Sequence, residues 1–533
     1  MHAPPTGTGT VPAQQSASRP RSSGAQPPGG EGAGRFVPWA WALAGAFFFL
    51  YMALSLRTHA RLGSHSFDLG IFAQSVRSWA AGQWPVSEVK GPDFPLMGDH
   101  FSPVVALLGP LYRLWPSVQL LLVAQAALVA VSTVPLTLWA RRALGTAAAV
   151  GIGLGYGLSW GVASAIGFDF HEYAFAAPLL ACSLTALGTG RMRAAVAWAL
   201  PLLLVKEDLG FTVAAIGVVI AWRGSRRLGL LTALGGLAAA LLTTFVVVPA
   251  FSPAGSWAYT GLLDGGPGGP GGAGTGAGAG TGAAGLLERL TLGMVTPEPK
   301  ATTVLVLLAP TLFLALRSPL VLVALPTVLW RLASAKWAHW GTGYHYSLLL
   351  MTILFAAFVD ALVRREGSAA SVRRYVAGAV GVCLLLLPQF PFWHLVRPEP
   401  WPAEPHLVTA QRVLARIPDG ATVQATDQLV PHLVDRTSVS MFGWQDSRPD
   451  PEWIVVDTTV PANVRWPLSA AAEAQALDQA RARGYRTVVR QDGFVLLTRT
   501  GTAGSGAGTG PRSGSGSGSG SAAGATVSGA PAR

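Results

Sequence analysis

The chain has little charge for its length. Of its 533 residues only 12% are charged, whereas 50% are hydrophobic and the mean hydropathy is +0.42. Soluble domains carry roughly 25% charged residues, so this composition excludes an ordinary soluble globular protein. We therefore expect most of the folded chain to lie in a lipid bilayer.

Cysteine is also scarce. The two cysteines, Cys182 and Cys383, fall inside apolar runs, where a free thiol behaves as a small hydrophobe. The sequence has no spaced set of cysteines and no zinc motif, which excludes a disulfide framework.

The sequence lacks a basic face with interleaved aromatics, although its formal net charge is +12. Most arginines stand in short clusters between apolar runs, where they act as topology signals. We therefore expect the lipid bilayer, and no nucleic acid, as a partner.

Both ends of the chain lack apolar periodicity. Residues 1–35 are rich in Pro, Gly, Ser and Ala, and residues 501–533 are Gly/Ser repeats, which predicts two disordered tails. The first apolar run comes too late and is too long for a cleavable signal, so we expect it to be an anchor.

Between the tails, apolar runs long enough to cross about 30 Å of hydrocarbon predict a mainly α, polytopic helical bundle over 36–393. The runs suggest about eleven membrane spans. Three of the runs are short, so this number could change by one or two, and 101–115 is a further candidate span. The runs lie near 36–56, 117–139, 146–166, 173–190, 194–206, 208–222, 228–250, 301–316, 319–335, 345–363 and 375–393.

The arginines between these runs fall on one side of the membrane if the N-terminus is cytoplasmic, as the positive-inside rule requires. This topology leaves long outer loops at 57–100 and 251–300, and the glycine-rich centre of the second should be mobile. The sorted arginines are Arg141, Arg142, Arg191, Arg193, Arg223, Arg226, Arg227, Arg317, Arg364, Arg365, Arg373 and Arg374.

The same topology puts 394–500 outside the cytoplasm. There the membrane-length runs give way to helix-like AQRVLARI, an alanine-rich helix near 469–484, and the strand-like segments ATVQAT, WIVVD, YRTVVRQ and GFVLLTRT. Short strands alternating with helices predict a small α/β domain.

Acidic and histidine side chains gather in the predicted outer turns. They could simply cap helices, because carboxylates favour helix N-termini. Alternatively, four turns meet at one aqueous cavity, since charges near the membrane surface usually face protein. The candidates are Asp68, Asp99, His100, Asp169, His171, Glu172, Lys206, Glu207 and Asp208.

The segment SAKWAHWGTGYHYS, 334–347, brings His345 and several aromatics to the same predicted face. These aromatics are either an interfacial belt or a platform for a sugar or phosphate headgroup. A divalent metal stays open as a cofactor, because Asp99-His100 and His171-Glu172 are adjacent pairs without the spacing of a known ligand motif.

Several stretches together resemble one family. They are FDLGIFAQSVRSWAAGQ, GDHFSPVVALLGPLYRLWPS followed by Gln125, DFHEYAFAAPLL, KEDLG, IPDGATVQATDQLVPHLVDR and RTVVRQDGFVLLTR. Over about 36–498, apart from the glycine-rich insert, the chain resembles the bacterial multi-pass membrane proteins known as domain of unknown function two-zero-seven-nine.

That family looks distantly similar to the glycosyltransferase C superfamily, whose members take sugar from a polyprenyl-phosphate donor. By this resemblance Asp68 is the candidate general base. Leu69 follows it where the usual pair has a second acid, and Asp99 could supply that acid from the end of the same loop.

The resemblance implies an integral membrane enzyme of the bacterial plasma membrane. It would transfer sugar from a polyprenyl-phosphate donor to an acceptor on the extracytoplasmic face, with His100, His171, Glu172, Lys206, Glu207, Asp208 and His345 binding substrate. The alternative is a transporter or flippase for a lipid-linked or anionic solute, which should hold ionisable groups near the bilayer midplane.

Overall fold

The structure, a computed structural model, describes residues 2, 37–257, 259, 291–294, 296–334, 336–365, 367–397, 404–462 and 464–499. Except for His2, the two predicted tails lie outside the described residues, and so does the glycine-rich centre of the loop 251–300.

Helices long and apolar enough to cross a membrane span Pro38–Ala60, Gln119–Leu144, Arg226–Phe251, His345–Arg364 and Ala369–Gln389. The pair Thr146–Gly157 and Trp160–Gly167, bent by 43°, would add one more. Shorter apolar helices occupy most of the other predicted runs. The mainly helical fold is confirmed, whereas the number of spans, about eleven by run length, stays a prediction.

The helices of this part are α1 (Pro38–Ala60), α2 (Ile71–Ala80), α3 (Gly109–Leu114), α4 (Gln119–Val131), α5 (Thr133–Leu144), α6 (Thr146–Gly157), α7 (Trp160–Gly167), α8 (Tyr173–Gly188), α9 (Met192–Ala199), α10 (Leu209–Trp222), α11 (Arg226–Leu242), α12 (Val248–Phe251), α14 (Glu298–Leu308), α15 (Leu325–Ala333), α16 (Trp337–Trp340), α17 (Leu348–Arg364) and α18 (Ala369–Leu386). Short strands β1 (Val86–Ser87) and β2 (Phe94–Pro95) pair in the first long loop.

The run 301–316 is not one continuous helix. Helix α14 ends at Leu308, and after Pro310 the backbone of Leu312 and Phe313 turns left-handed, with φ of 51° and 60°. Proline removes a helical donor, and left-handed residues end the helical hydrogen-bond pattern. An apolar run alone does not show where a helix breaks.

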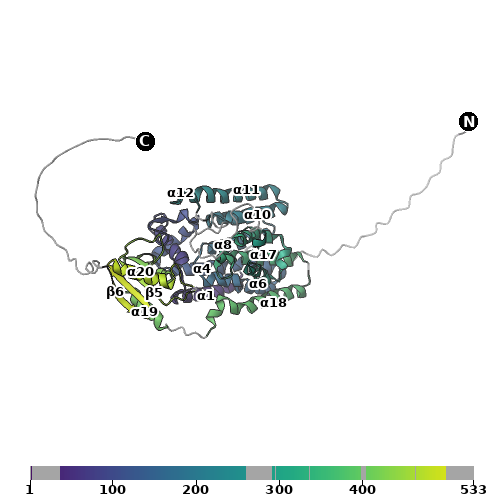
Figure 1. Cartoon of the computed structure of the whole chain (residues 1–533). Helices are drawn as coiled ribbons and strands as arrows, with labels where there is room; N and C mark the ends of the chain where they lie inside the picture. The colour runs from purple at the N-terminus through teal and green to yellow at the C-terminus, as the bar shows by residue number, and fades with distance from the viewer. Residues whose placement is uncertain are drawn as a thin grey trace, which may run out of the picture. The chain divides into compact units, whose positions relative to one another are not determined.

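Helices α10 and α11 lie side by side (Figure 1) with their backbones in close approach. A Cβ on Gly236 of α11 would stand 2.7 Å from both Ala214 N and Gly210 O of α10. Such close backbone contact is possible because Gly236 has no side chain, and small residues allow it in many membrane helix pairs.

The C-terminal region contains a five-stranded mixed sheet of order β4-β3-β5-β7-β6. Strands β4, β3 and β5 run parallel, and β7 pairs antiparallel with both β5 and β6. The elements are α19 (Pro405–Leu414), β3 (Thr422–Ala425), the 3-10 helix η14 (Asp427–His432), β4 (Ser438–Met441), β5 (Trp453–Asp457), α20 (Ala470–Ala482), β6 (Tyr485–Gln491) and β7 (Phe494–Arg499).

Each of the four predicted strands is present, and β4 is an additional edge strand. Between β6 and β7, Asp492 and Gly493 both have positive φ, 47° and 85°, as a tight hairpin with an Asp-Gly turn requires. The described elements of 404–499 are therefore α/β, whereas the domain boundary near 394 stays a prediction.

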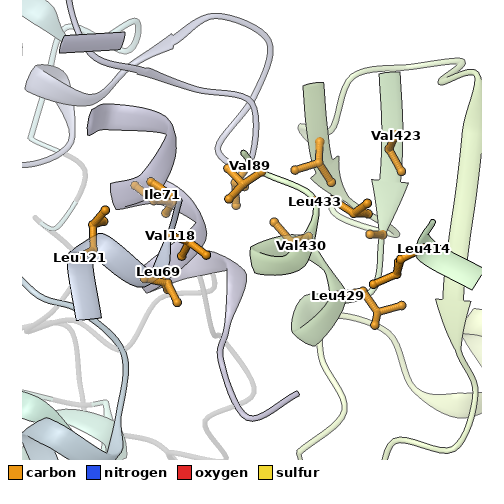
Figure 2. Close-up of a cluster of buried hydrophobic side chains, with 14 of the residues drawn as sticks. Leu69, Ile71, Val89, Val118, Leu121, Leu414, Val423, Leu429, Val430 and Leu433 are labelled. Carbon is orange, nitrogen blue, oxygen red and sulfur yellow. The ribbon is translucent and has the colours of Figure 1, made fainter. Parts of the chain in front are cut away.

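One hydrophobic core joins the first long loop to the sheet region. Leu69 and Ile71 beside α2 belong to the same buried cluster as Val430 and Leu433. Figure 2 shows Val89 facing the η14 side chains across this core. The sheet region therefore packs directly against the segment that carries Asp68.

Candidate functional site

Asp68 lies in the short helical turn η1 (Ser66–Gly70) between α1 and α2. Its side chain is half-buried, and no described residue donates a hydrogen bond to its carboxylate. Burial, reinforced by the charge of Asp169, raises the pKa of Asp68 to about 7. This carboxyl group is thus accessible and unpaired.

The turn η1 is held by two carboxylates from distant segments. The backbone N–H of Ser66 donates to Asp427 Oδ1 at 2.9 Å, and the Ser66 hydroxyl donates to the same oxygen. The backbone N–H of His65 donates to Asp169 Oδ2 at 2.8 Å, and its Nδ1 lies 3.1 Å from that oxygen. Burial opposes protonation of His65, but the bond to Asp169 and its charge raise the histidine pKa to about 9.

His171 and His345 stack their rings beside Asp68, with centroids 3.5 Å apart and planes inclined by 21°. One ligand atom from each of the three residues lies within 4.8 Å of the other two. Burial lowers the pKa of His171 to about 4, which keeps this imidazole neutral near pH 7. Both ring nitrogens of His345 are buried without a hydrogen-bond partner among the described residues.

A buried arginine shapes the segment that delivers His345. Arg331 is 2% exposed, and its guanidinium donates to His339 O at 2.6 Å, Gly341 O at 3.1 Å and Ser347 Oγ at 3.1 Å. These hydrogen bonds hold the segment before α17 in contact with the Arg331 guanidinium. The conformation of 336–347 is therefore fixed from inside the protein.

Glu172 and Lys206 form a buried ion pair next to the histidines. Lys206 Nζ lies 2.9 Å from Glu172 Oε1, and His171 Nδ1 lies 2.9 Å from Oε2. Both contacts are at ion-pair distance but outside hydrogen-bond geometry. Burial works against ionisation of Glu172, but His171 and Lys206 together hold the pKa of Glu172 below its usual range.

Glu207 connects this ion pair to a second group. His100 Nδ1 lies 2.7 Å from Glu207 Oε1, and the backbone N–H of Phe101 donates to Oε2 at 3.1 Å. Burial opposes ionisation, but His100 and then Lys206 lower the pKa of Glu207. The turns containing His100 and Glu207 therefore meet.

Asp99 differs from Asp68 because its carboxylate is occupied. Lys90 Nζ and Tyr259 OH both donate to Asp99 Oδ1 at 3.0 Å, and the Tyr259 ring stacks on His100 with centroids 4.6 Å apart. A carboxylate engaged by a lysine and a phenol is a weaker proton acceptor than a free one.

All nine predicted site residues thus belong to contacting groups. Asp68, His171, Glu172, Lys206 and His345 form one cluster, Asp99, His100 and Glu207 form the next, and Asp208 accepts a bond of 2.7 Å from Tyr173 OH. Their catalytic and binding roles stay predictions. A cavity of about 890 Å³ lies elsewhere, beside Arg317 and Arg364, so the predicted aqueous cavity is untested.

The sequence did not indicate four residues that hold the site, namely His65, Lys90, Tyr259 and Asp427, and it gave Asp169 no role in catalysis or substrate binding. Asp169 precedes His171 in DFHEY, which made it visible as an outer-turn acid. Asp427 follows a strand at the start of a helical turn, where an acid usually means a cap. Nothing in the local pattern indicated that it reaches Ser66.

Among the solved structures that match the chain, one has a similar fold by its TM-score and a second matches more weakly. The crystal structure of ArnT from Cupriavidus metallidurans bound to undecaprenyl phosphate matches with a TM-score of 0.51 and 14% identity, covering 87% of this chain and 98% of that chain. ArnT from the same organism in the apo state matches with a TM-score of 0.45 and 16% identity, over 86% and 97% of the two chains.

No curated protein matches the chain. The family described as predicted membrane protein (DUF2079) matches residues 58–496, which include every element of the site. With its apolar helices, the protein is a membrane protein, and the chain belongs to the DUF2079 family.

Proposed function

We propose that the protein transfers a sugar from a polyprenyl-phosphate donor to an acceptor hydroxyl, with Asp68 as the general base. The observation that carries this proposal is the unpaired, half-buried Asp68 carboxylate beside a buried cluster of two histidines and a lysine. The fold it shares with a protein crystallised with undecaprenyl phosphate supports a polyprenyl lipid as the donor.

The site offers a residue for the proton transfer and a residue for the developing negative charge. Asp68 takes the proton of the acceptor hydroxyl as that oxygen forms a bond to C1 of the sugar. The bond between C1 and the phosphate oxygen breaks, and the polyprenyl phosphate leaves with its electron pair. Lys206 is the cation of the cluster that can stabilise this developing charge.

We assign the site to the extracytoplasmic face of the bacterial plasma membrane. The arginine clusters of the sequence support this assignment, because the positive-inside rule puts the turns of Asp68, His171, Lys206 and His345 opposite them. The sheet region packs on η1, so it occupies the same side of the membrane as Asp68.

As an alternative to the base role of Asp68, a divalent metal ion could occupy this cluster, because a carboxylate that binds a metal ion no longer accepts a proton readily. Asp68, His171 and His345 offer a carboxylate and two imidazoles, a donor set suited to Zn²⁺, and the unpartnered nitrogens of His345 fit such a ligand. The ion would stabilise negative charge on the leaving phosphate. This metal-binding alternative predicts about one Zn²⁺ per chain after dialysis, and less than half of that for His345→Ala, by elemental analysis. Equal metal contents would contradict the assignment.

The function itself is tested by transfer of labelled sugar from a polyprenyl-phosphate pool in membranes. Asp68→Asn should lower the rate by at least about 100-fold, because an amide has similar shape but cannot take a proton. The matched control is Asp93→Asn in the same loop, whose side chain is 85% exposed, and it should keep the wild-type rate.

Unchanged thermal midpoints for both variants would separate chemistry from folding. Full transfer by Asp68→Asn would eliminate this residue as base and move the role to Asp99 or Glu207. An inactive wild type with every donor would favour the transporter or flippase.

A further inference from the structure

A second polar site lies at the other ends of the helices that lead from the Asp68 cluster. Helix α10 begins after Lys206 and Glu207 and ends before Arg223, and α17 begins after His345 and ends at Arg364. At 1.5 Å per residue, these helices separate the two sites by about 20–25 Å.

The distal site is a cavity of about 890 Å³. Its described lining contains three arginines, Arg223, Arg317 and Arg364, and no acidic residue. This volume falls within the range of about 300–1,000 Å³ typical of small-ligand pockets.

A buried carboxylate behind the cavity orients two of these arginines. Asp360 is 3% exposed and accepts from Arg223 Nη2 at 2.9 Å, from Arg364 Nε at 2.7 Å and from the Ser318 hydroxyl at 2.7 Å. Three guanidinium charges against one carboxylate leave a net charge of +2 (3 − 1). Arg317 makes no ion pair with any described residue.

Apart from Ser318, the remaining wall of the cavity is apolar and partly exposed. Trp222 is 69% exposed and Leu316 is 54% exposed, and Leu322 lines the same cavity. Tryptophan beside arginine is typical of the depth of lipid headgroups. A ligand complementary to the whole cavity therefore needs an anionic part for the three arginines and an apolar part for this wall.

We propose that this cavity binds the phosphate headgroup of an anionic glycerophospholipid from the adjacent leaflet. The three guanidiniums bind phosphate oxygens, for which their planar donors are suited, and the first acyl carbons lie on Trp222 and Leu316. Basic pockets between membrane helices bind acidic headgroups by the same chemistry. The arginines of this site therefore bind lipid in addition to orienting the chain.

The test uses the full chain in detergent, titrated with phosphatidylglycerol or with phosphatidylcholine of the same acyl chains. Native mass spectrometry counts bound lipid, and the thermal midpoint reports stabilisation. We expect phosphatidylglycerol to bind and raise the midpoint, and phosphatidylcholine to do neither. Inorganic pyrophosphate is the probe for a soluble anion.

The informative variant is Arg317→Gln, and the matched control is Arg374→Gln, an exposed arginine of α18 outside the cavity. Arg317→Gln should bind phosphatidylglycerol about fivefold more weakly, while Arg374→Gln binds like the wild type. Arg317→Lys, which keeps the charge, should retain most of the binding.

Equal weakening by Arg317→Gln and Arg374→Gln would overturn the site, because it would mean attraction by surface charge alone. Equal binding of both lipids would overturn the selectivity for an anionic lipid, because phosphatidylcholine also carries a phosphate but has no net charge. Stabilisation by pyrophosphate that depends on Arg317, without stabilisation by phosphatidylglycerol, would replace the lipid by a soluble anion.

Discussion

At the scale of single residues, the cluster around Asp68 depends on the ion pair of Glu172 and Lys206. The Glu172 side chain is 1% exposed and that of Lys206 is 11% exposed, so neither charge is solvated by bulk water. A buried charge that loses its partner costs several kcal/mol. Lys206 thus has a structural role as well as the proposed role in charge stabilisation.

Replacing Lys206 by methionine should lower the free energy of unfolding by about 3–5 kcal/mol, since Glu172 would remain buried without its cation. The double variant Glu172→Gln with Lys206→Met removes both charges and should regain much of this loss. Denaturation in detergent measures both values. A single variant as stable as the wild type would show that Glu172 is neutral or reached by water.

At the scale of elements, the close packing of α10 on α11 depends on glycine, which has no side chain. Gly235 and Gly236 are adjacent on α11, but only Gly236 faces α10, and a Cβ on Gly235 would meet nothing within 4 Å. Substituting each glycine in turn separates the effect of helix propensity from the effect of helix packing. Both positions lie in the same helix, but only Gly236 contacts α10.

Gly236→Ala should destabilise the protein by about 1–3 kcal/mol, because the added methyl group would clash with the backbone of α10 and push the two helices apart. Gly235→Ala should be neutral or stabilise by up to about 1 kcal/mol, because alanine favours the helix. Thermal unfolding of the two variants provides the comparison. Equal midpoints would mean that α10 and α11 separate without cost.

At the scale of the whole molecule, the sheet region and the first long loop share a hydrophobic core and therefore one side of the membrane. Arg448 adds a bidentate ion pair to Glu88 of that loop, with both bonds at 2.8 Å. The side they share is a prediction from the arginine clusters.

A cysteine at position 478 of α20, where the Asp478 side chain is 76% exposed, should react with an impermeant maleimide on intact cells. Arg227→Cys, at the start of α11, should react only after permeabilisation, because the predicted topology puts it in the cytoplasm. The wild type, whose two cysteines lie in helices, is the background control. The reverse labelling pattern would invert the topology.

The sequence by itself determined the membrane character, most helices, four strands and the set of polar turns. These are local properties, because apolar run length, strand alternation and acidic clusters are read within a few residues of one another. WIVVD and YRTVVRQ coincide with β5 and β6 for this reason.

Only the tertiary structure decided which turns meet. Asp427 holds Ser66 across 361 positions of sequence, and His345 stacks on His171, contacts that depend on how distant elements pack. The edge strand β4 was likewise decided by its pairing with β3 rather than by local pattern. Packing also distinguished Asp68 from Asp99, because Lys90 and Tyr259 reach only the second carboxylate.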